Sequence, residues 1–358
     1  MISSRLVALS RCPDCRGQLG DAGHDVRCEC CGRVYVQSQG YLDLRPREVF
    51  AEQTRYLDDS LHADARHESV SPPLLSAAVR NDMLRAFLAV QPGDRVIDLG
   101  CGSGRALIWN RDRGAYQVGL DVSPFFAQEA RAEVDLALGD LRRLPFGDGA
   151  FTKAYALDVL EHLSREALAD MLREAARVLE PGGRLFVYSH VRQNAPIAGG
   201  LRAINWLARR LEAVGLVDLA RERLRKSDHV NPLADIDDLE RTVEAAGFRI
   251  ARIRYYTPLV AGLMENIVVR VAERVLARRT AAKAGADRPA QSGGETAAGV
   301  GPGAPGVRGA RAEAKRRIAQ RGPTYAALVG LTWLMKLDIV LFGRIRSGPF
   351  FALLEKRR

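Results

Sequence analysis

The sequence contains no uncharged apolar run of about eighteen residues or more, the length that a helix needs to cross the hydrocarbon of a bilayer. Its first residues, MISSRLVALSRC, lack the long apolar stretch and the small-residue cleavage site of a secretory signal. A membrane-spanning or secreted protein is therefore not expected, and we predict a cytoplasmic one. The 358 residues are 47% hydrophobic and 27% charged, which is typical of a soluble globular chain.

Cysteine is scarce beyond residue 31, where Cys101 alone is found. The first 31 residues hold two C-x-x-C pairs separated by twelve residues, with Cys30 left over. Two such turns on a hairpin bring four thiolates to one tetrahedral ion, so in a reducing compartment this spacing predicts a metal site rather than disulfides. A redox-active thiol pair is the alternative, but no catalytic context surrounds the cysteines. The predicted structural Zn²⁺ ligands are Cys12, Cys15, Cys28 and Cys31.

The segment CGRVYVQSQGYLDLRP at 31–46 resembles the zinc ribbons that precede some bacterial methyltransferases, including guanine-N1 ribosomal RNA methyltransferases. We predict a zinc ribbon over 1–47. A module this small buries too little apolar surface to fold alone, so the metal supplies its folding energy. Removal of the metal is then expected to unfold this module alone.

A buried strand that ends in a glycine-rich turn is predicted at VIDLGCGSG, 96–104. The short apolar run before the turn is typical of a parallel strand. Gly100, Gly102 and Gly104 let the backbone approach a ligand closely at the start of the next helix. Their G-x-G-x-G spacing differs from the G-x-G-x-x-G of dinucleotide binders.

Three successive predicted strands end in acids, namely Asp98, Asp121 and Asp140. Asp121 follows the glycine turn by about twenty residues, where an acid in nucleoside-binding α/β folds accepts hydrogen bonds from the ribose hydroxyls. Each acid alone is also explained as a helix N-cap. All three in this order favour one ligand site at a single edge of the sheet.

With these motifs, the segment from about Arg95 to His190 resembles the class I S-adenosylmethionine-dependent methyltransferases of the type 11 group. The resemblance is carried by DLGCGSG (98–104), Asp121, GDLRRLPF (139–146), DVLEHL (158–163) and RVLEPGGRLFV (177–187). It implies an α/β fold with a seven-stranded Rossmann-like sheet, helices on both faces, and S-adenosylmethionine as the cofactor. It also implies the cofactor contacts: Asp98, Gly100, Gly102 and Gly104 for the methionine moiety, Asp121 for ribose, and Asp140 with Leu141 for adenine.

Methyl transfer from a sulfonium is an in-line displacement in which the protein mainly aligns the nucleophile, so a dedicated base is optional. Asp158, His162 and His190 are weak catalytic candidates, because they lie at or just after the carboxyl ends of the fourth and fifth strands, where open α/β sheets bind ligands. Alternatively, His162 packs in the following helix and His190 simply ends its strand.

Two segments exceed the minimal fold, and we therefore assign the methyltransferase domain to 48–358 with insertions at 191–232 and 258–343. The first insertion carries apolar residues at helical spacing, which predicts either a lid over the acceptor or an extra helix on the sheet edge. The last strand is predicted at 348–357, about 90 residues after its neighbour in the sheet.

The second insertion contains two apolar helical patterns, at 258–280 and 324–342, and between them a segment, 281–310, in which twenty of thirty residues are Ala, Gly or Pro. This middle segment is predicted to be a flexible linker. The twelve uncharged residues from Thr324 to Met335 are too few to span a bilayer. Both helices are therefore predicted either to lie on the inner membrane face or to pack on each other and the sheet.

The net charge of +10 is concentrated at 270–321, which holds twelve basic and four acidic residues. Such a segment attracts anionic lipid or nucleic acid, but it contains no aromatic residue for base stacking. An apolar or lipid-like small-molecule acceptor is therefore favoured over the alternative, ribosomal or other RNA held by the ribbon and the basic segment. The sequence predicts neither the acceptor atom nor the oligomeric state.

Overall fold

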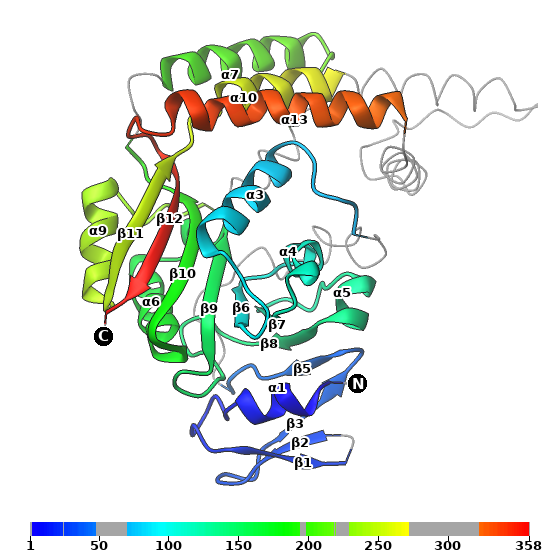
Figure 1. Cartoon of the computed structure of the whole chain (residues 1–358), viewed down its shortest axis with the longest axis vertical. Helices are drawn as coiled ribbons and strands as arrows, with labels where there is room; N and C mark the ends of the chain where they lie inside the picture. Colours follow the sequence, from blue (N-terminus) through cyan, green and yellow to red (C-terminus); the bar gives the residue numbers. More distant parts are fainter. Residues whose placement is uncertain are drawn as a thin grey trace, which may run out of the picture.

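The computed structural model, which describes residues 2–23, 25–47, 70–193, 198–217, 219, 229–271 and 322–357, centres on a nine-stranded sheet (Figure 1). The strand order is β11-β12-β10-β9-β6-β7-β8-β5-β4. The strands are β4 (Gln37–Ser38), β5 (Tyr41–Asp43), β6 (Arg95–Leu99), β7 (Tyr116–Asp121), β8 (Asp135–Leu138), β9 (Phe151–Leu157), β10 (Leu179–His190), β11 (Phe248–Tyr255) and β12 (Pro349–Lys356).

The seven strands from β6 to β12 confirm the predicted class I methyltransferase sheet. Strands β6 to β10 run parallel to their neighbours, and β12 lies between β10 and β11, antiparallel to both. The strand predicted at 348–357 is β12, which joins the sheet between β10 and β11 although about 90 residues separate it from β11 in the chain.

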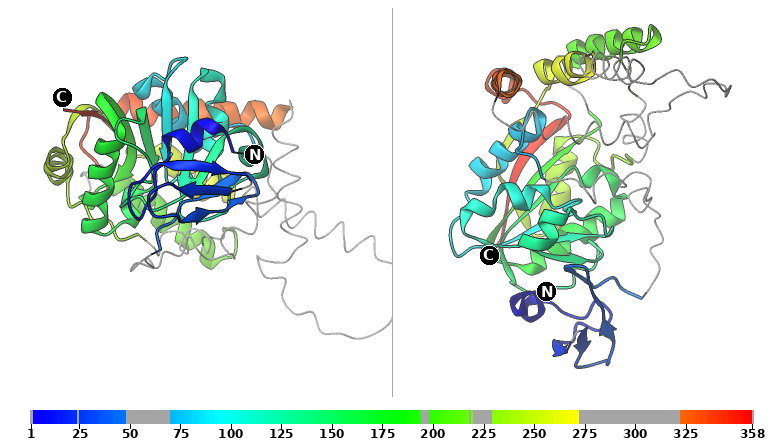
Figure 2. Two further views of the ribbon diagram at one scale, coloured as in Figure 1. Left: turned by 90° about the horizontal axis from the view of Figure 1, so that it is seen from below. Right: turned by 90° about the vertical axis from the view of Figure 1, so that its right-hand side faces the viewer.

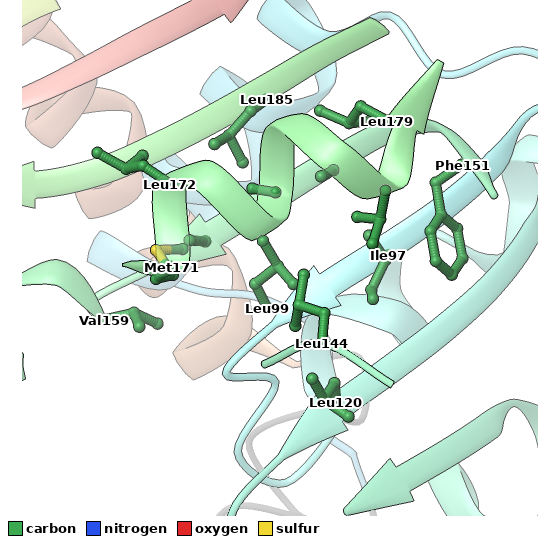
Figure 3. Packing of buried hydrophobic residues seen from close by; sticks show 14 of the residues in the cluster. Ile97, Leu99, Leu120, Leu144, Phe151, Val159, Met171, Leu172, Leu179 and Leu185 are labelled. Carbon is green, nitrogen blue, oxygen red and sulfur yellow. The ribbon is translucent and has the colours of Figure 1, made fainter. Parts of the chain in front are cut away.

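Helices cover both faces of the sheet. On one face, α6 (Arg165–Val178) lies against β10 and α9 (Ile236–Ala245) against β11, and Figure 3 shows Met171 and Leu172 of α6 in one cluster with Leu99 and Leu185. The other face packs against α3 (Ser76–Leu88), α4 (Arg105–Trp109) and α5 (Gln128–Glu133). Each core is fully buried, as expected for a parallel sheet whose strands are apolar on both faces.

The N-terminal module, residues 2–47, extends the main sheet. It contains α1 (Ser4–Leu9) and a separate three-stranded sheet of β1 (Leu19–Ala22), β2 (Asp25–Cys28) and β3 (Val34–Tyr35). Its last strand, β5, pairs in parallel with β8 of the main sheet, and Leu6, Leu42 and Leu44 belong to the same buried cluster as Ile97. The domain boundary at residue 47 stays a prediction, but the two parts share one sheet and one core.

Three helical segments form a layer at the end of the molecule opposite the N-terminal module (Figures 1 and 2). They are α7 (Ala198–Ala213), α10 (Leu259–Leu263) with the π-helix that continues it (Met264–Val269), and α13 (Pro323–Phe342). We call them the helical layer. The two C-terminal helices therefore pack on each other, as one of the two predicted alternatives requires. The predicted linker at 281–310 lies outside the described residues. The sequence also predicts a helical region at roughly 48–90, of which residues 48–69 lie outside the described residues and α3 forms part of the rest.

Polar contacts fix α13 to the domain. The Asp338 carboxylate is fully buried and accepts hydrogen bonds from Val260 N and Ala261 N, the free amides at the start of α10. The Thr332 hydroxyl accepts from Leu75 N just before α3. Among the residues the structure describes, α13 is the one helix long and apolar enough to cross a membrane, yet these contacts place one of its faces against the protein.

Candidate active site

The glycine turn joins β6 to α4. Gly100 N and Cys101 N donate to Leu120 O of β7 at 2.8 and 3.0 Å, which holds the turn against the next strand. Gly102 has a φ of +53°, where a side chain is strained, and a Cβ there would meet no atom within 4 Å. The turn thus presents bare backbone to open space at the carboxyl edge of the sheet, as the sequence predicts.

Asp98 and Asp121 lie beside this turn. Asp121 Oδ2 accepts from Gly102 N at 2.7 Å and Oδ1 accepts from Ser123 N at 2.9 Å, so backbone amides fix the carboxylate beside the turn, where an acid in nucleoside-binding folds accepts from the ribose hydroxyls. Burial raises the pKa of Asp121, and burial together with the Asp121 charge raises the pKa of Asp98 well above its usual range. Two acids held close together in this way favour a cationic ligand.

Asp140 and Leu141 follow β8 at the same edge. The Asp140 carboxylate is tied to its neighbour Arg142, with both oxygens 3.1 Å from Arg142 Nε and Oδ1 2.9 Å from Arg142 N. Leu141 is half-buried against the core. The predicted role of these two residues at adenine stays a prediction, and the Asp140 carboxylate already has a strong cationic partner.

Asp158 directly follows β9 and has a strained backbone conformation. Its φ is +55°, a region that non-glycine residues adopt rarely and that clusters at functional sites. Its N–H donates to Tyr188 O of β10, and its carboxylate pairs with Arg80 Nη1 of α3 at 2.8 Å. The Arg80 guanidinium also lies 5.4 Å from the centre of the Tyr188 ring. Arg80 is a site residue that the sequence pattern does not reveal.

The three weak catalytic candidates gather around one buried carboxylate, that of Glu161. Glu161 is 1% exposed, its Oε2 accepts from Ser189 Oγ at 2.7 Å, and its Oε1 lies 3.7 Å from His190 Nδ1. Burial, together with the nearby Asp158 charge, raises the pKa of Glu161 to about 7. Glu161 and His162 lie in the 3₁₀ turn Leu160–His162, so His162 precedes α6 instead of packing within it.

His229 completes this cluster from the first insertion. Its ring centre lies 4.6 Å from that of His162 and 5.3 Å from that of His190. The segment after it is held by two backbone hydrogen bonds, from Val230 N and Asn231 N to the carbonyl oxygen of Glu161, at 2.8 and 2.9 Å. His229 lies 67 residues after His162, and no local pattern in the sequence indicates their contact.

The four predicted zinc ligands converge in the N-terminal module. The sulfur atoms of Cys12, Cys15, Cys28 and Cys31 all lie within 4.8 Å of one another. Cys12 Sγ lies 3.7 Å from Cys31 Sγ, and Cys15 Sγ lies 3.5 Å from Cys28 Sγ. Four thiolates about 2.3 Å from a tetrahedral Zn²⁺ would be roughly 3.8 Å apart. Burial raises the pKa of Cys12, but the hydrogen bonds from Tyr35 and from the backbone amides of Cys15 and Asp14 together lower it to about 7, which favours the metal-binding thiolate.

Gly17 is required by this arrangement. A Cβ at Gly17 would lie 2.6 Å from Cys30 Cβ and 2.9 Å from Cys28 Sγ, so a larger residue would push the knuckles apart. Gly17 is needed for this close approach and not for its backbone conformation, because the residue with a left-handed φ in the first knuckle is Arg16, at +63°. The residues present therefore fit a structural zinc ion, with Cys30 exposed and outside the set.

In comparisons with known proteins, the central part of the chain is similar to methyltransferases. Residues 97–187 match a family model described as a methyltransferase domain. The chain is 33% identical over 157 residues to the 27-O-demethylrifamycin SV methyltransferase of Amycolatopsis mediterranei, covering 39% of this chain and 57% of that protein. It is 38% identical over 104 residues to the demethylmenaquinone methyltransferase of Mycobacterium tuberculosis, covering 29% of this chain and 44% of that protein.

The same comparisons extend over only part of each relative. The chain covers between 47% and 61% of the length of the first curated relatives that it matches. Among solved structures, the crystal structure of the [4+2]-cyclase SpnF is similar with a TM-score of 0.44 and 19% identity, over 84% of this chain and 93% of that chain. The matched family segment contains the glycine turn, Asp121, Asp140, Asp158, Glu161 and His162.

Proposed function

We propose that this chain, whose central domain belongs to the class I S-adenosylmethionine-dependent methyltransferases, transfers a methyl group from S-adenosylmethionine to an apolar or lipid-like small molecule. The observation that carries the proposal is the 2.7 Å contact between Gly102 N and Asp121 Oδ2 at the carboxyl ends of β6 and β7. This contact places glycine backbone beside a carboxylate, which suits a ribose with an attached methionine chain.

The charges at this edge fit the donor. S-adenosylmethionine carries a positive sulfonium and a positive ammonium group, and Asp98 and Asp121 are acids whose pKa values are raised by burial. A cationic ligand offsets the cost of ionising two neighbouring carboxylates, of which Asp98 is buried and Asp121 partly buried. The bound donor supplies an already activated methyl group, so the task of the chain is to bind, align and exclude water.

The helical layer supports an apolar acceptor. It lies beyond the carboxyl end of β10 (Figure 1), and Asp158 follows the carboxyl end of β9, which runs parallel to β10. Both named relatives are called methyltransferases of small molecules, 27-O-demethylrifamycin SV and demethylmenaquinone, which favours a small-molecule acceptor over RNA. The predicted RNA contact relies on the ribbon and the basic segment, and the ribbon lies at the far end of the molecule (Figure 2).

The helical layer is also our candidate for peripheral membrane contact. The outer face of α13 exposes an apolar stripe at helical spacing, formed by Trp333, Leu334, Leu337, Val340 and Leu341. Trp206 and Leu207 of α7 and Val268 of the π-helix are exposed as well, and Arg344 and Arg346 follow α13 at the surface. An apolar face flanked by basic side chains suits the headgroup region of an anionic bilayer.

Replacing Val340 and Leu341 together by glutamate is expected to weaken binding to vesicles of mixed neutral and anionic phospholipid by at least tenfold. Both side chains are exposed, at 76% and 62%, so the fold is retained while two charges enter the stripe. Flotation of the full chain with vesicles measures the effect. Val36→Glu is the matched control, because Val36 is 57% exposed in the N-terminal module at the other end of the molecule. Equal binding by the wild type and the double variant would remove the membrane contact from the proposal.

Incubation with methyl-labelled S-adenosylmethionine and separate lipid and RNA extracts tests the acceptor class. We expect label to enter the solvent-extractable small molecules and to change little between low and high salt, because apolar contacts are not screened. Label that enters RNA, with a yield that falls steeply as salt is added, would instead support the RNA methyltransferase alternative. Asp121→Ala serves as the inactive control in both arms.

A further inference from the structure

We infer that Glu161, His162 and His229 bind a divalent first-row transition-metal ion beside the cofactor turn, and that this ion binds an acceptor through a hydroxyl group. The inference rests on the proposed methyl transfer for its role in catalysis, whereas the metal site itself follows from the side chains. It is separate from the cysteine site, which lies in the N-terminal module.

The three side chains place their ligand atoms together. One carboxylate oxygen of Glu161 and one ring nitrogen each of His162 and His229 all lie within 4.8 Å of one another. Around a bound ion, ligand atoms at about 2.1 Å lie roughly 3 to 3.5 Å apart. Small side-chain rotations therefore bring these three onto one ion. The rings of His162 and His229 are nearly perpendicular, at 87°, so they approach a shared point from different directions.

The surroundings hold this geometry in place. The hydrogen bonds from Val230 N and Asn231 N to Glu161 O clamp the His229 segment onto the 3₁₀ turn that carries Glu161 and His162. Ser189 Oγ donates to Glu161 Oε2 and orients the carboxylate. Partners of this kind orient the ligands in protein metal sites, and the other oxygen, Oε1, lies 3.7 Å from His190 Nδ1.

The donor set and the local charge select the kind of ion. Two imidazoles with one carboxylate suit divalent manganese, iron, cobalt or zinc, whereas magnesium and calcium prefer oxygen ligands alone. Glu161 is fully buried and a second acid, Asp158, lies close to it, with Arg80 paired to Asp158. A buried carboxylate with another acid beside it is costly without a cation.

The metal site lies next to the glycine turn, and this position suggests what the ion does in catalysis. A Cβ at Gly100 would lie 2.7 Å from Val159 Cγ2, so the glycine turn touches the short segment between Asp158 and Glu161. An acceptor hydroxyl bound to the ion loses its proton to water more readily, because the ion stabilises the oxyanion. The oxyanion attacks the donor methyl group, the C–S bond breaks, and its electron pair returns to sulfur to leave a neutral thioether.

Electron paramagnetic resonance of Mn²⁺ added to the full chain, loaded beforehand with only the one equivalent of zinc that the cysteine site holds, tests the site. We expect one bound Mn²⁺ whose spin-echo modulation reports two imidazole nitrogens. His162→Ala and His229→Ala should each weaken Mn²⁺ binding by at least tenfold, and each should remove one imidazole signal from the spectrum at saturating Mn²⁺. A structural role alone would not change the number of coordinated nitrogens.

Cofactor binding provides the cross-control. Calorimetry without Mn²⁺ should show that both histidine variants bind S-adenosylmethionine within about twofold of the wild type, while Asp121→Ala loses the cofactor but retains Mn²⁺. Absence of bound Mn²⁺ in the wild type, or a spectrum without imidazole nitrogens, would overturn the metal site and leave the methyltransferase proposal standing. Loss of cofactor binding in the wild type would contradict the methyltransferase proposal and leave the metal site intact.

Discussion

Asp121→Ala is expected to weaken S-adenosylmethionine binding by more than a hundredfold while the protein remains folded. The substitution removes the acceptor of two ribose hydroxyls, and hydrogen bonds to a charged group contribute about 1.5 to 3 kcal/mol each. The fold should not suffer, because Asp121 is a partly buried acid that raises the pKa of its neighbour Asp98. Gly102 N and Ser123 N lose their acceptor, and we expect water to enter the space left by the carboxylate and to accept from them.

Calorimetric titration with S-adenosylmethionine and with its demethylated product measures this effect. Asp140→Ala is the matched comparison, an acid at the end of the next strand whose carboxylate already pairs with Arg142. We expect it to weaken binding by only about tenfold or less, since the loss amounts to one hydrogen bond at most. Unchanged cofactor affinity in Asp121→Ala, with an unaltered melting temperature, would place the ribose elsewhere and contradict the site.

Loss of the metal from the cysteine site is expected to lower the melting temperature by more than about 10 °C, because structural zinc contributes on the order of 10 kcal/mol to such modules. The sequence alone predicts that only the ribbon unfolds. In the structure, however, β5 pairs with β8, and Leu42 and Leu44 belong to the main core. The effect should therefore spread into the sheet edge.

The loop after β8 should be affected as well. Arg16 Nη1 donates to Leu144 O and Arg143 Nη2 donates to Asp14 O, so the first cysteine knuckle supports the loop that follows Asp140 and Leu141. Hydrogen exchange should show lost protection in 19–44 and in 135–147, but retained protection in β10 and β12. Weaker cofactor binding should accompany this loss.

Cys28→Ser and Cys30→Ser form the matched pair for this test. Cys28 is buried and lies in the four-sulfur set, whereas Cys30 is exposed and outside it. Cys28→Ser should lose the zinc ion of the cysteine site and have a lower melting temperature. Cys30→Ser should retain that zinc ion and have an unchanged melting temperature. Equal stability of the two variants, or metal analysis that finds no zinc in the wild type, would end the zinc interpretation.

The helix α13 illustrates what a single sequence leaves open. Lys336 and Asp338 interrupt its apolar run, which argues against a membrane span when only the sequence is considered. In the structure, Asp338 accepts from the first amides of α10, and Lys336 pairs with Asp82 at 2.6 Å. Lys336 and Asp338, the two charged residues that interrupt the apolar run, are therefore the side chains that attach α13 to the domain.

The sequence by itself determined the strands, the glycine turn, Asp121 and the cysteine set, because each of these follows from residues close together in the chain. A turn needs glycines at fixed spacing, and a C-x-x-C knuckle needs only four residues. Only the tertiary structure decided that β5 joins the main sheet and that His229 meets Glu161 and His162. These contacts join segments 67 or more residues apart through backbone hydrogen bonds that any residue can make, so side-chain patterns carry no trace of them.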